Sequence, residues 1–219
     1  MKIIDVKQNT PGWEAVRLGK PTASEFHRII TAVKGDLSKS ARGYAHGLIA
    51  ETLLGRPLAK PPGNLWAADR GKELEPLAIQ QYAYTNEVEI KRVGFVTTDN
   101  GKIGCSPDGL LVGAKGGLEV KCCLDEKHMG IWLDGPGEDF KQQVQGNLAV
   151  AELEYWDLYA YHPELPPKTI RTFRDEPYIA KLSAALAEFL AIRDEMLAKA
   201  MQSGFFAQAN DNRAQAVAA

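Results

Sequence analysis

The stretch Cys105-Ser106-Pro107-Asp108-Gly109-Leu110 decides the fold and the chemistry that we expect of this chain, together with a second stretch. The second, which follows a glycine-containing loop, is Leu118-Glu119-Val120-Lys121-Cys122. The first segment predicts a strand that ends in a turn, and the second predicts a short apolar strand. Successive strand side chains alternate between faces, so Glu119 and Lys121 point to the same face. A hairpin between the two segments would place Asp108 beside Glu119.

Asp108, Glu119 and Lys121 are the residue types that metal-dependent phosphodiester hydrolysis needs. Carboxylates hold a divalent cation, which activates water and offsets charge on the leaving phosphate. We therefore expect Asp108 and Glu119 to bind Mg²⁺, with Mn²⁺ as a substitute, and the backbone carbonyl of Val120 to add an oxygen ligand. Lys121 is expected to orient or deprotonate the attacking water, or to stabilise the phosphate in the transition state.

Each half of this pattern also has a purely structural interpretation. Glu119 and Lys121 alone would be read as a surface ion pair, and Pro107-Asp108-Gly109 alone as a plain turn. The functional interpretation is favoured because both halves occur together, ahead of a predicted helix over about 138–151 that carries several glutamines.

The segments around these strands alternate between helical and strand patterns. Helices are predicted from about residue 23, where Thr22-Ala23-Ser24-Glu25 has the form of a capping box, after Ser38 as far as Gly55, and over about 68–86, with Pro76 in the early turns or at a kink. A β-meander is predicted over 88–98 and 102–112, strands over 155–161 and near 169–173, and a helix over 177–200. The stretch 202–219 is expected to be a tail or a partner-contacting extension.

The composition is that of a globular protein. With 219 residues, 45% of them hydrophobic, the chain is long enough for one α/β domain. No apolar run approaches a membrane span and the N-terminus lacks a secretory signal, so we expect no membrane partner and a cytoplasmic location. Three cysteines are too few for a cysteine metal cluster and are predicted to be reduced, buried thiols.

The charge distribution bears on nucleic-acid binding. A formal net charge of −2 argues mildly against it, because phosphate binding usually leaves a basic footprint. Residues 1–60, however, hold ten Lys and Arg against five Asp and Glu. This basic first third could line a DNA groove or could equally form solvated helix faces.

An ordered set of motifs resembles the restriction-endonuclease-like nucleases and, among them, the phage lambda exonuclease branch. The set consists, in chain order, of Trp13 with Arg17-Leu18-Gly19, Thr22 to Glu25, Arg70-Gly71-Lys72 with Glu75, the two segments quoted first, and Gln143-Val144-Gln145. The resemblance covers about residues 13–150. It implies an α/β fold, with a restriction-endonuclease-like core in which a central mixed β-sheet is flanked by helices. The chain would form a single nuclease domain, with N-terminal helices 1–87 for DNA-end binding, a catalytic core 88–175 and a C-terminal helix and tail 176–219.

The resemblance also implies roles for residues outside the two strands. Glu75 would complete the metal site directly or through water, although Pro76 directly after it restricts its backbone. Gln143 would line the active site. Arg17 and Ser24 would bind the 5′-phosphate at the DNA end, in keeping with the forked hydrogen bonds that arginine makes to phosphate.

The activity that the resemblance implies is a magnesium-dependent 5′ to 3′ exonuclease acting at double-stranded DNA ends. Members of this branch form a ring-shaped homotrimer and leave a 3′ single strand for an annealing protein, and we expect both partners here. Enclosure by a ring would keep DNA bound without a very basic surface.

Two other functions remain open on the sequence. One is a site-specific or structure-specific endonuclease of the same fold. The other is a non-catalytic DNA-end-binding scaffold for recombination, which the intact Asp108, Glu119 and Lys121 set disfavours. A hydrolase with a cysteine nucleophile is the least favoured, because no histidine base is evident.

Overall fold

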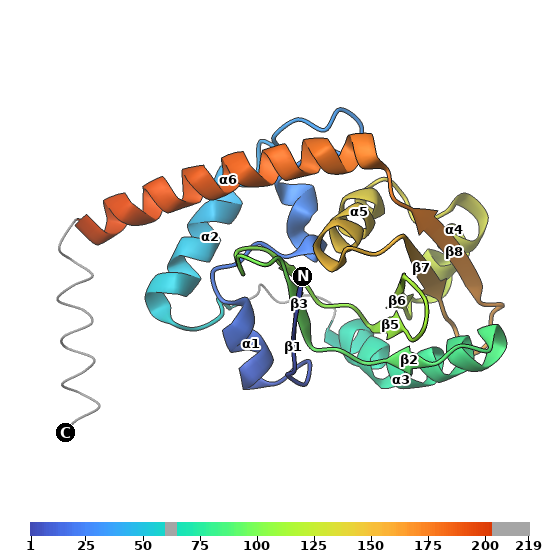
Figure 1. Cartoon of the computed structure of the whole chain (residues 1–219). Coiled ribbons are helices and arrows are strands. Elements are labelled where there is room, and N and C mark those ends of the chain that lie inside the picture. Colours follow the sequence, from blue (N-terminus) through green and yellow to red (C-terminus); the bar gives the residue numbers. More distant parts are fainter. Residues whose placement is uncertain (60–64, 203–219) are drawn as a thin grey trace, which may run out of the picture.

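The computed structural model describes residues 1–59 and 65–202, and their strands form two sheets (Figure 1). The larger sheet has the order β2-β5-β6-β7-β8, which are Ile90–Lys91, Gly109–Leu111, Gly116–Lys121, Tyr155–Ala160 and Lys168–Phe173. It is mixed, because β6 and β7 run parallel while the other neighbours are antiparallel. The smaller, antiparallel sheet joins β1 (Lys2–Ile4), β3 (Phe95–Thr97) and β4 (Gly104–Cys105).

The single β-meander predicted over 88–98 and 102–112 is wrong, because these residues divide between the two sheets. β2 and β5 belong to the larger sheet, whereas β3 and β4 pair with the N-terminal strand β1. The chain changes sheets near Gly94, where an added Cβ would lie 1.8 Å from the carbonyl oxygen of Val6. The N-terminal segment thus packs directly against the backbone of Gly94, where any side chain would collide with Val6.

Seven helices of the described residues surround the sheets, one of them a 3₁₀ helix. They are α1 (Pro11–Arg17), η1 (Ala23–Arg28), α2 (Ala41–Leu54), α3 (Leu65–Asn86), α4 (Asp125–Asp134), α5 (Asp139–Ala151) and α6 (Glu176–Gln202). The helix predicted after Ser38 ends as expected at Gly55, which takes a left-handed φ of 64°. Pro76 lies inside α3 rather than in its early turns. The tail predicted over 202–219 falls outside the described residues after Gln202.

Helices cover the larger sheet from opposite sides (Figure 1). On one side, Ala78, Ile79 and Tyr82 of α3 pack with Leu118 and Val120 of β6. On the other side α5 lies in the larger core cluster, in which it packs with η1 and α6. The strand alternation of β6 therefore turns Leu118 and Val120 toward α3 and leaves Glu119 on the side of α5.

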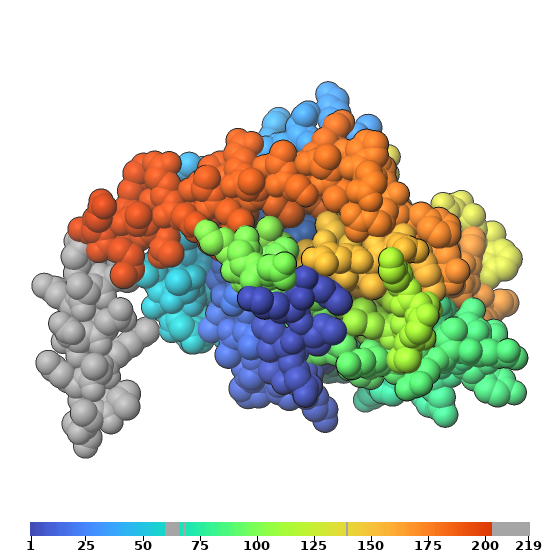
Figure 2. Space-filling view, in the orientation of Figure 1, coloured from blue at the N-terminus to red at the C-terminus, as the bar shows by residue number. Residues whose placement is uncertain are grey.

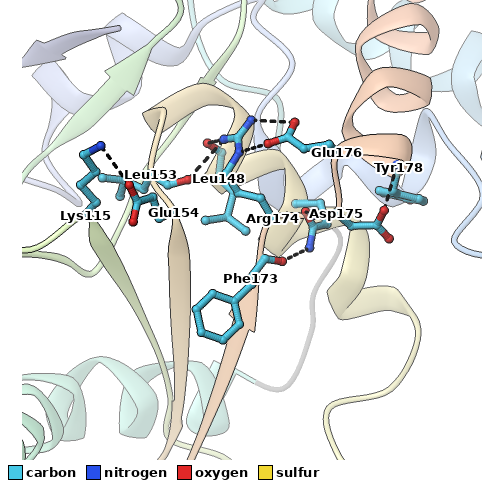
Figure 3. A network of polar contacts seen from close by, with 10 residues as sticks. Lys115, Leu148, Leu153, Glu154, Phe173, Arg174, Asp175, Glu176 and Tyr178 are labelled. Atoms are coloured by element: carbon cyan, nitrogen blue, oxygen red, sulfur yellow. Dashed lines mark hydrogen bonds and ion pairs between the residues drawn. The ribbon is translucent and has the colours of Figure 1, made fainter.

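A polar network joins α5 to the sheet and to α6 (Figure 3). The guanidinium of Arg174, which follows β8, donates to the carbonyl oxygens of Leu148 at 2.8 Å and Leu153 at 3.3 Å and also pairs with Glu176. The Leu148 carbonyl lies in the last turn of α5, where it also accepts from the backbone amide of Glu152, and Leu153 follows the helix directly after this cap. Arg174 thus fixes the helix that carries Gln143.

α6 forms a long ridge over α2 and α5 in the space-filling view (Figure 2). Buried side chains line about its first half, from Tyr178 to Leu190. Within the described part of the chain, no helix is both long enough and apolar enough to cross a membrane.

Candidate active site

The β5–β6 hairpin brings Asp108 to the edge of β6. Gly109 pairs with Leu118, and the backbone amide of Asp108 donates to the carbonyl of Leu118 at 3.1 Å. One carboxylate oxygen of Asp108, Oδ2, accepts a hydrogen bond of 2.7 Å from the backbone amide of Val120. The carboxylate is therefore held against the strand that carries Glu119 and Lys121.

Glu119 is the centre of a second group of contacts on the face of the sheet that α5 covers. Its Oε1 accepts from the Nζ of Lys121 at 2.7 Å and from the Nε2 of Gln143 at 2.8 Å. The Glu119 side chain is only 8% exposed, whereas that of Lys121 is 35% exposed. The structure thus brings together Asp108, Glu119, Lys121 and Gln143, which belong to three motifs spread over 35 residues of the sequence.

The electrostatics of these residues reflect two acids in a partly buried place. Burial raises the pKa of the Asp108 carboxyl well above its usual range, and the nearby charge of Glu119 raises it further, against the hydrogen bond from Val120. Burial alone would lower the pKa of Lys121, but the charge and hydrogen bond of Glu119 outweigh burial and raise it. The Lys121 ammonium group pairs with Glu119, so a cation bound beside Asp108 would offset the charge of the second carboxylate.

The atoms around Asp108 fit a hard divalent cation. Carboxylate and carbonyl oxygens are the ligands that Mg²⁺ prefers. Along a strand, the backbone groups of successive residues point to opposite edges. Those of Leu118 and Val120 point to the edge of β6 where Asp108 lies, whereas the carbonyl of Lys121 points to the other edge and accepts from the backbone amide of Tyr161 at 3.0 Å. The Val120 carbonyl therefore points toward the same place as the Asp108 carboxylate.

Glu75 pairs with Arg92 rather than with Asp108 or Glu119. Its Oε1 accepts a hydrogen bond of 2.6 Å from Arg92, and its charge reaches Asp108 only as a smaller influence on the pKa of that carboxyl. Among the described residues, no group of three or more His, Cys, Asp or Glu side chains is arranged to hold a metal ion. Asp108, Glu119 and the Val120 carbonyl therefore remain the candidate oxygen ligands, whereas Glu75 pairs with Arg92 and acts on Asp108 through its charge.

Arg17 and Ser24 meet at a third residue, Thr22. Arg17 donates to the hydroxyl of Ser106 at 2.7 Å and to that of Thr22 at 3.4 Å, and the hydroxyls of Thr22 and Ser24 are 3.4 Å apart. The guanidinium also stacks over Trp13, 4.2 Å from the ring centroid. Burial is the largest influence on the Arg17 guanidinium and lowers its pKa from the usual range.

Thr22 and Ser106 also belong to this group of contacts, although their sequence patterns did not indicate such a role. Thr22 was interpreted as the first residue of a capping box, and this interpretation is wrong, because its side chain makes no cap hydrogen bond to η1. Its hydroxyl faces Arg17 instead. Ser106 stood in the quoted motif, two residues before Asp108, so its position was available but its partner, 89 residues away, was not.

The three thiols are not arranged for catalysis. Cys105 is buried, whereas Cys122 and Cys123 are partly exposed, which corrects the prediction that all three are buried. Burial raises the pKa of Cys105 and raises that of Cys122 to about 12, so these thiols are protonated at neutral pH.

A mixed sheet flanked by helices, with an acid at the start of β5 and a Glu-x-Lys strand next to it, defines the class of restriction-endonuclease-like nucleases. More narrowly, the chain belongs to the YqaJ-like viral recombinase domain family, whose model matches residues 12–154. The expected α/β fold and the expected exonuclease branch are confirmed.

Solved structures agree with this assignment. An alkaline exonuclease from Laribacter hongkongensis has 28% sequence identity and a TM-score of 0.79, over 89% of this chain and 98% of that one, and its structure in complex with dAMP gives the same values. A phage-related exonuclease from Haemophilus somnus 129PT shares the fold, with 17% identity and a TM-score of 0.67 over 82% of this chain and 96% of that one. No curated protein sequence matches the chain.

Proposed function

We propose that the chain is a magnesium-dependent exonuclease that digests the 5′-ended strand of duplex DNA from an end and leaves 3′ single-stranded overhangs for strand annealing. The observation that carries this proposal is the hydroxyl of Ser106, which accepts from Arg17 and lies two residues before Asp108. A group of polar side chains suited to a terminal phosphate is thereby joined to the acidic pair by one short segment. The alkaline exonuclease with 28% identity supports the same activity.

Each residue has a role that its contacts allow. Asp108, Glu119 and the Val120 carbonyl would hold Mg²⁺, and Mn²⁺ could replace it; the bound cation would activate water and offset charge on the phosphate. Lys121, beside Glu119, orients the attacking water or stabilises the phosphate charge. Gln143 fixes the Glu119 carboxylate through its hydrogen bond of 2.8 Å. Glu75 acts through its charge or through water.

Arg17 and Ser24 are proposed to bind the 5′-phosphate. The Arg17 guanidinium lies over the Trp13 ring and is hydrogen-bonded to Ser106, so its position is fixed before DNA binds. Ser24 is exposed at the start of η1, where its hydroxyl is open to a ligand. A phosphate bound here would receive charged and neutral hydrogen bonds at once.

The test is a time course on a linear duplex with different labels at the 5′ and 3′ ends of one strand, in Mg²⁺ and in chelator. We expect the 5′ label to be released first as mononucleotide in Mg²⁺, with no release in chelator. Asp108→Ala is the control and should release neither label. Earlier release of the 3′ label would overturn the polarity.

Covalently closed plasmid separates this proposal from its competitors. An enzyme that requires an end leaves the plasmid intact, whereas a site-specific or structure-specific endonuclease nicks or linearises it. A non-catalytic DNA-end-binding scaffold would leave the plasmid intact and would also release no nucleotide from the linear duplex. The proposal also includes a homotrimeric ring around the DNA and an annealing protein that takes up the 3′ strand.

A further inference from the structure

Gln8 lies in the loop between β1 and α1 and reaches the segment that carries Asp108. Its side-chain Nε2 donates to two backbone carbonyls, that of Val93 at 2.9 Å and that of Pro107 at 2.8 Å. An amide nitrogen carries two hydrogens, and both are used here. One side chain therefore ties together three parts of the chain, at residues 8, 93 and 107.

The contact with Pro107 fixes the peptide group that precedes Asp108. This group consists of the Pro107 carbonyl and the Asp108 amide. The carbonyl accepts from Gln8, and the amide donates to Leu118 at 3.1 Å. Because a peptide group is planar, holding its oxygen and its nitrogen at opposite edges fixes its rotation. The direction in which the Asp108 side chain leaves the backbone is fixed with it.

The position of Pro107 explains why a side chain is needed. β4 ends at Cys105 and β5 begins at Gly109, so residues 106–108 lie between strands. Pro107 is buried, and a buried carbonyl needs a hydrogen-bond donor. Gln8 supplies this donor from a segment that is 99 residues away in sequence.

The contact with Val93 links the same side chain to the neighbourhood of Glu75. Val93 follows Arg92, whose guanidinium pairs with Glu75 at 2.6 Å. Gln8 thus sets the distance between the segment of Arg92 and the segment of Asp108. A carboxylate at this position would face two carbonyl oxygens without a hydrogen to donate.

We propose that Gln8 is a positioning residue for Asp108, which orients the carboxylate for its metal by holding the Pro107–Asp108 peptide group. The metal part of this proposal rests on the proposed function above. Partners that orient metal ligands change metal affinity by about 10-fold to 100-fold when they are removed.

The test compares Gln8→Met, which keeps the length of the side chain and removes both donors, with Gln8→Glu. Gln80→Ala, on an exposed residue of α3, is the matched control. Mn²⁺ binding is measured by titration calorimetry without DNA, and the Mg²⁺ concentration for half-maximal cleavage is measured separately. For both Gln8 variants we expect about 10-fold weaker Mn²⁺ binding and a higher Mg²⁺ concentration for half-maximal cleavage. The cleavage rate at saturating Mg²⁺ and the affinity for duplex in chelator should change less.

A metal-free measurement keeps the proposal testable if the metal site itself is wrong. Hydrogen exchange of the Asp108 amide should be at least several-fold faster in Gln8→Met than in wild type, while amides in α6 keep their rates. If wild type binds no Mn²⁺, the metal part of the proposed function fails, but faster exchange still supports the positioning role. Wild-type exchange at Asp108 together with wild-type Mn²⁺ affinity in Gln8→Met would overturn it.

Discussion

Lys121 contacts one of the two acids directly, and this makes it the sharpest test of the chemistry at the residue scale. Its ammonium group lies 2.7 Å from Glu119, and the side chain as a whole is 35% exposed, so a phosphate can approach it. Lys121→Met should lower cleavage by roughly 10²-fold to 10⁴-fold, which is the usual contribution of a positioned proton-transfer group. Initial rates on a linear duplex measure the loss.

The control for this prediction is Lys115→Met, which removes an equally charged but 71% exposed side chain from the turn before β6. Lys115→Met should cleave at the wild-type rate. DNA binding of both variants, measured in chelator, should differ little from wild type. Wild-type cleavage by Lys121→Met would remove Lys121 from the active site.

Arg17 gives a second prediction at this scale. Its guanidinium contacts two hydroxyl groups and stacks on Trp13, a geometry that an ammonium group does not reproduce. Arg17→Lys should therefore lose most of the preference for a 5′-phosphate over a 5′-hydroxyl end, although the charge is kept. Digestion rates on matched duplexes with either end measure this ratio. Arg56→Lys is the control, and equal ratios in wild type and Arg17→Lys would exclude the phosphate role.

The residues of the site differ in how far sequence alone could find them. Asp108, Glu119 and Lys121 were predictable because a hairpin and strand alternation are local rules. Their meeting with Gln143 depended on α5 packing across β6, and the resemblance to a family supplied it. No local sequence pattern predicts the ion pair between Arg92 and Glu75, because the two side chains approach each other only when α3 has packed against the sheet.

At the scale of elements, the approach of α5 to η1 depends on Gly146. A Cβ at this position would lie 2.4 Å from the ring of Phe26, which is fully buried, and 3.3 Å from Ala23. Gly146→Ala should lower the free energy of unfolding by about 1–3 kcal/mol, because crowding in a packed core exceeds the gain in helix propensity. Urea unfolding measures the change.

Gly43→Ala is the control for this experiment. Gly43 also lies in a helix, α2, but an added Cβ would meet nothing within 4 Å. This variant should gain about 0.5–1 kcal/mol from helix propensity alone. If both variants are stabilised, the contact between α5 and η1 is not as close as the structure has it.

The start of α6 is capped by Asp175, which gives a pH-dependent prediction. Its carboxylate accepts from the backbone amide of Tyr178 at 3.1 Å, and its ion pair with Lys141 is 3.0 Å long. The hydrogen bond to Lys141, followed by that of Tyr178, lowers the pKa of Asp175. Since the folded-state pKa is lowered, the stabilisation is present above the unfolded value of about 3.9 and is lost as the pH falls through the folded value.

Asp175→Ala should therefore cost about 1 kcal/mol at pH 7 and progressively less below about pH 4. Melting temperatures of wild type and variant at a series of pH values measure the difference. Asp5→Ala, on an exposed residue, should show no such difference. A difference that stays constant down to the lowest pH would mean that the charge of Asp175 takes no part in the cap.

Most long elements could be predicted from periodicity, and the errors have physical causes. β6, α5, β7, β8 and α6 were found because each has a clear apolar pattern over several residues. α4 was missed because it buries only His128 and Ile131 and so lacks an apolar stripe. The segment that begins after Thr22 forms a 3₁₀ helix of six residues rather than the longer α-helix predicted, and α5 packs closely against it.

At the scale of the whole molecule, the part of the fold that sequence did not predict is the smaller sheet. β1 pairs with β3, which lies more than 90 residues later in the sequence, and no local sequence pattern predicts so distant a partner. This pairing brings the N-terminal segment, drawn in blue, against the middle of the chain (Figure 2). The loop that bears Gln8 and the helix that bears Arg17 reach the Asp108 segment for that reason.

The proposed homotrimeric ring explains how a chain of net charge −2 could hold DNA over many cleavage steps. A protein held by phosphate contacts alone dissociates much more readily when salt rises from about 50 to about 200 mM. A closed ring is held by topology, so salt should slow loading but not interrupt digestion that has begun. We therefore expect a solution mass three times the 24.0 kDa of one chain and, after excess linear competitor is added, digestion that continues to the end of a long duplex at both salt concentrations. Covalently closed circular DNA is the control competitor, because it offers no end to a ring and should not reduce loading. A monomeric mass, or digestion that stops when the linear competitor arrives, would show that electrostatic contacts and not enclosure retain the DNA.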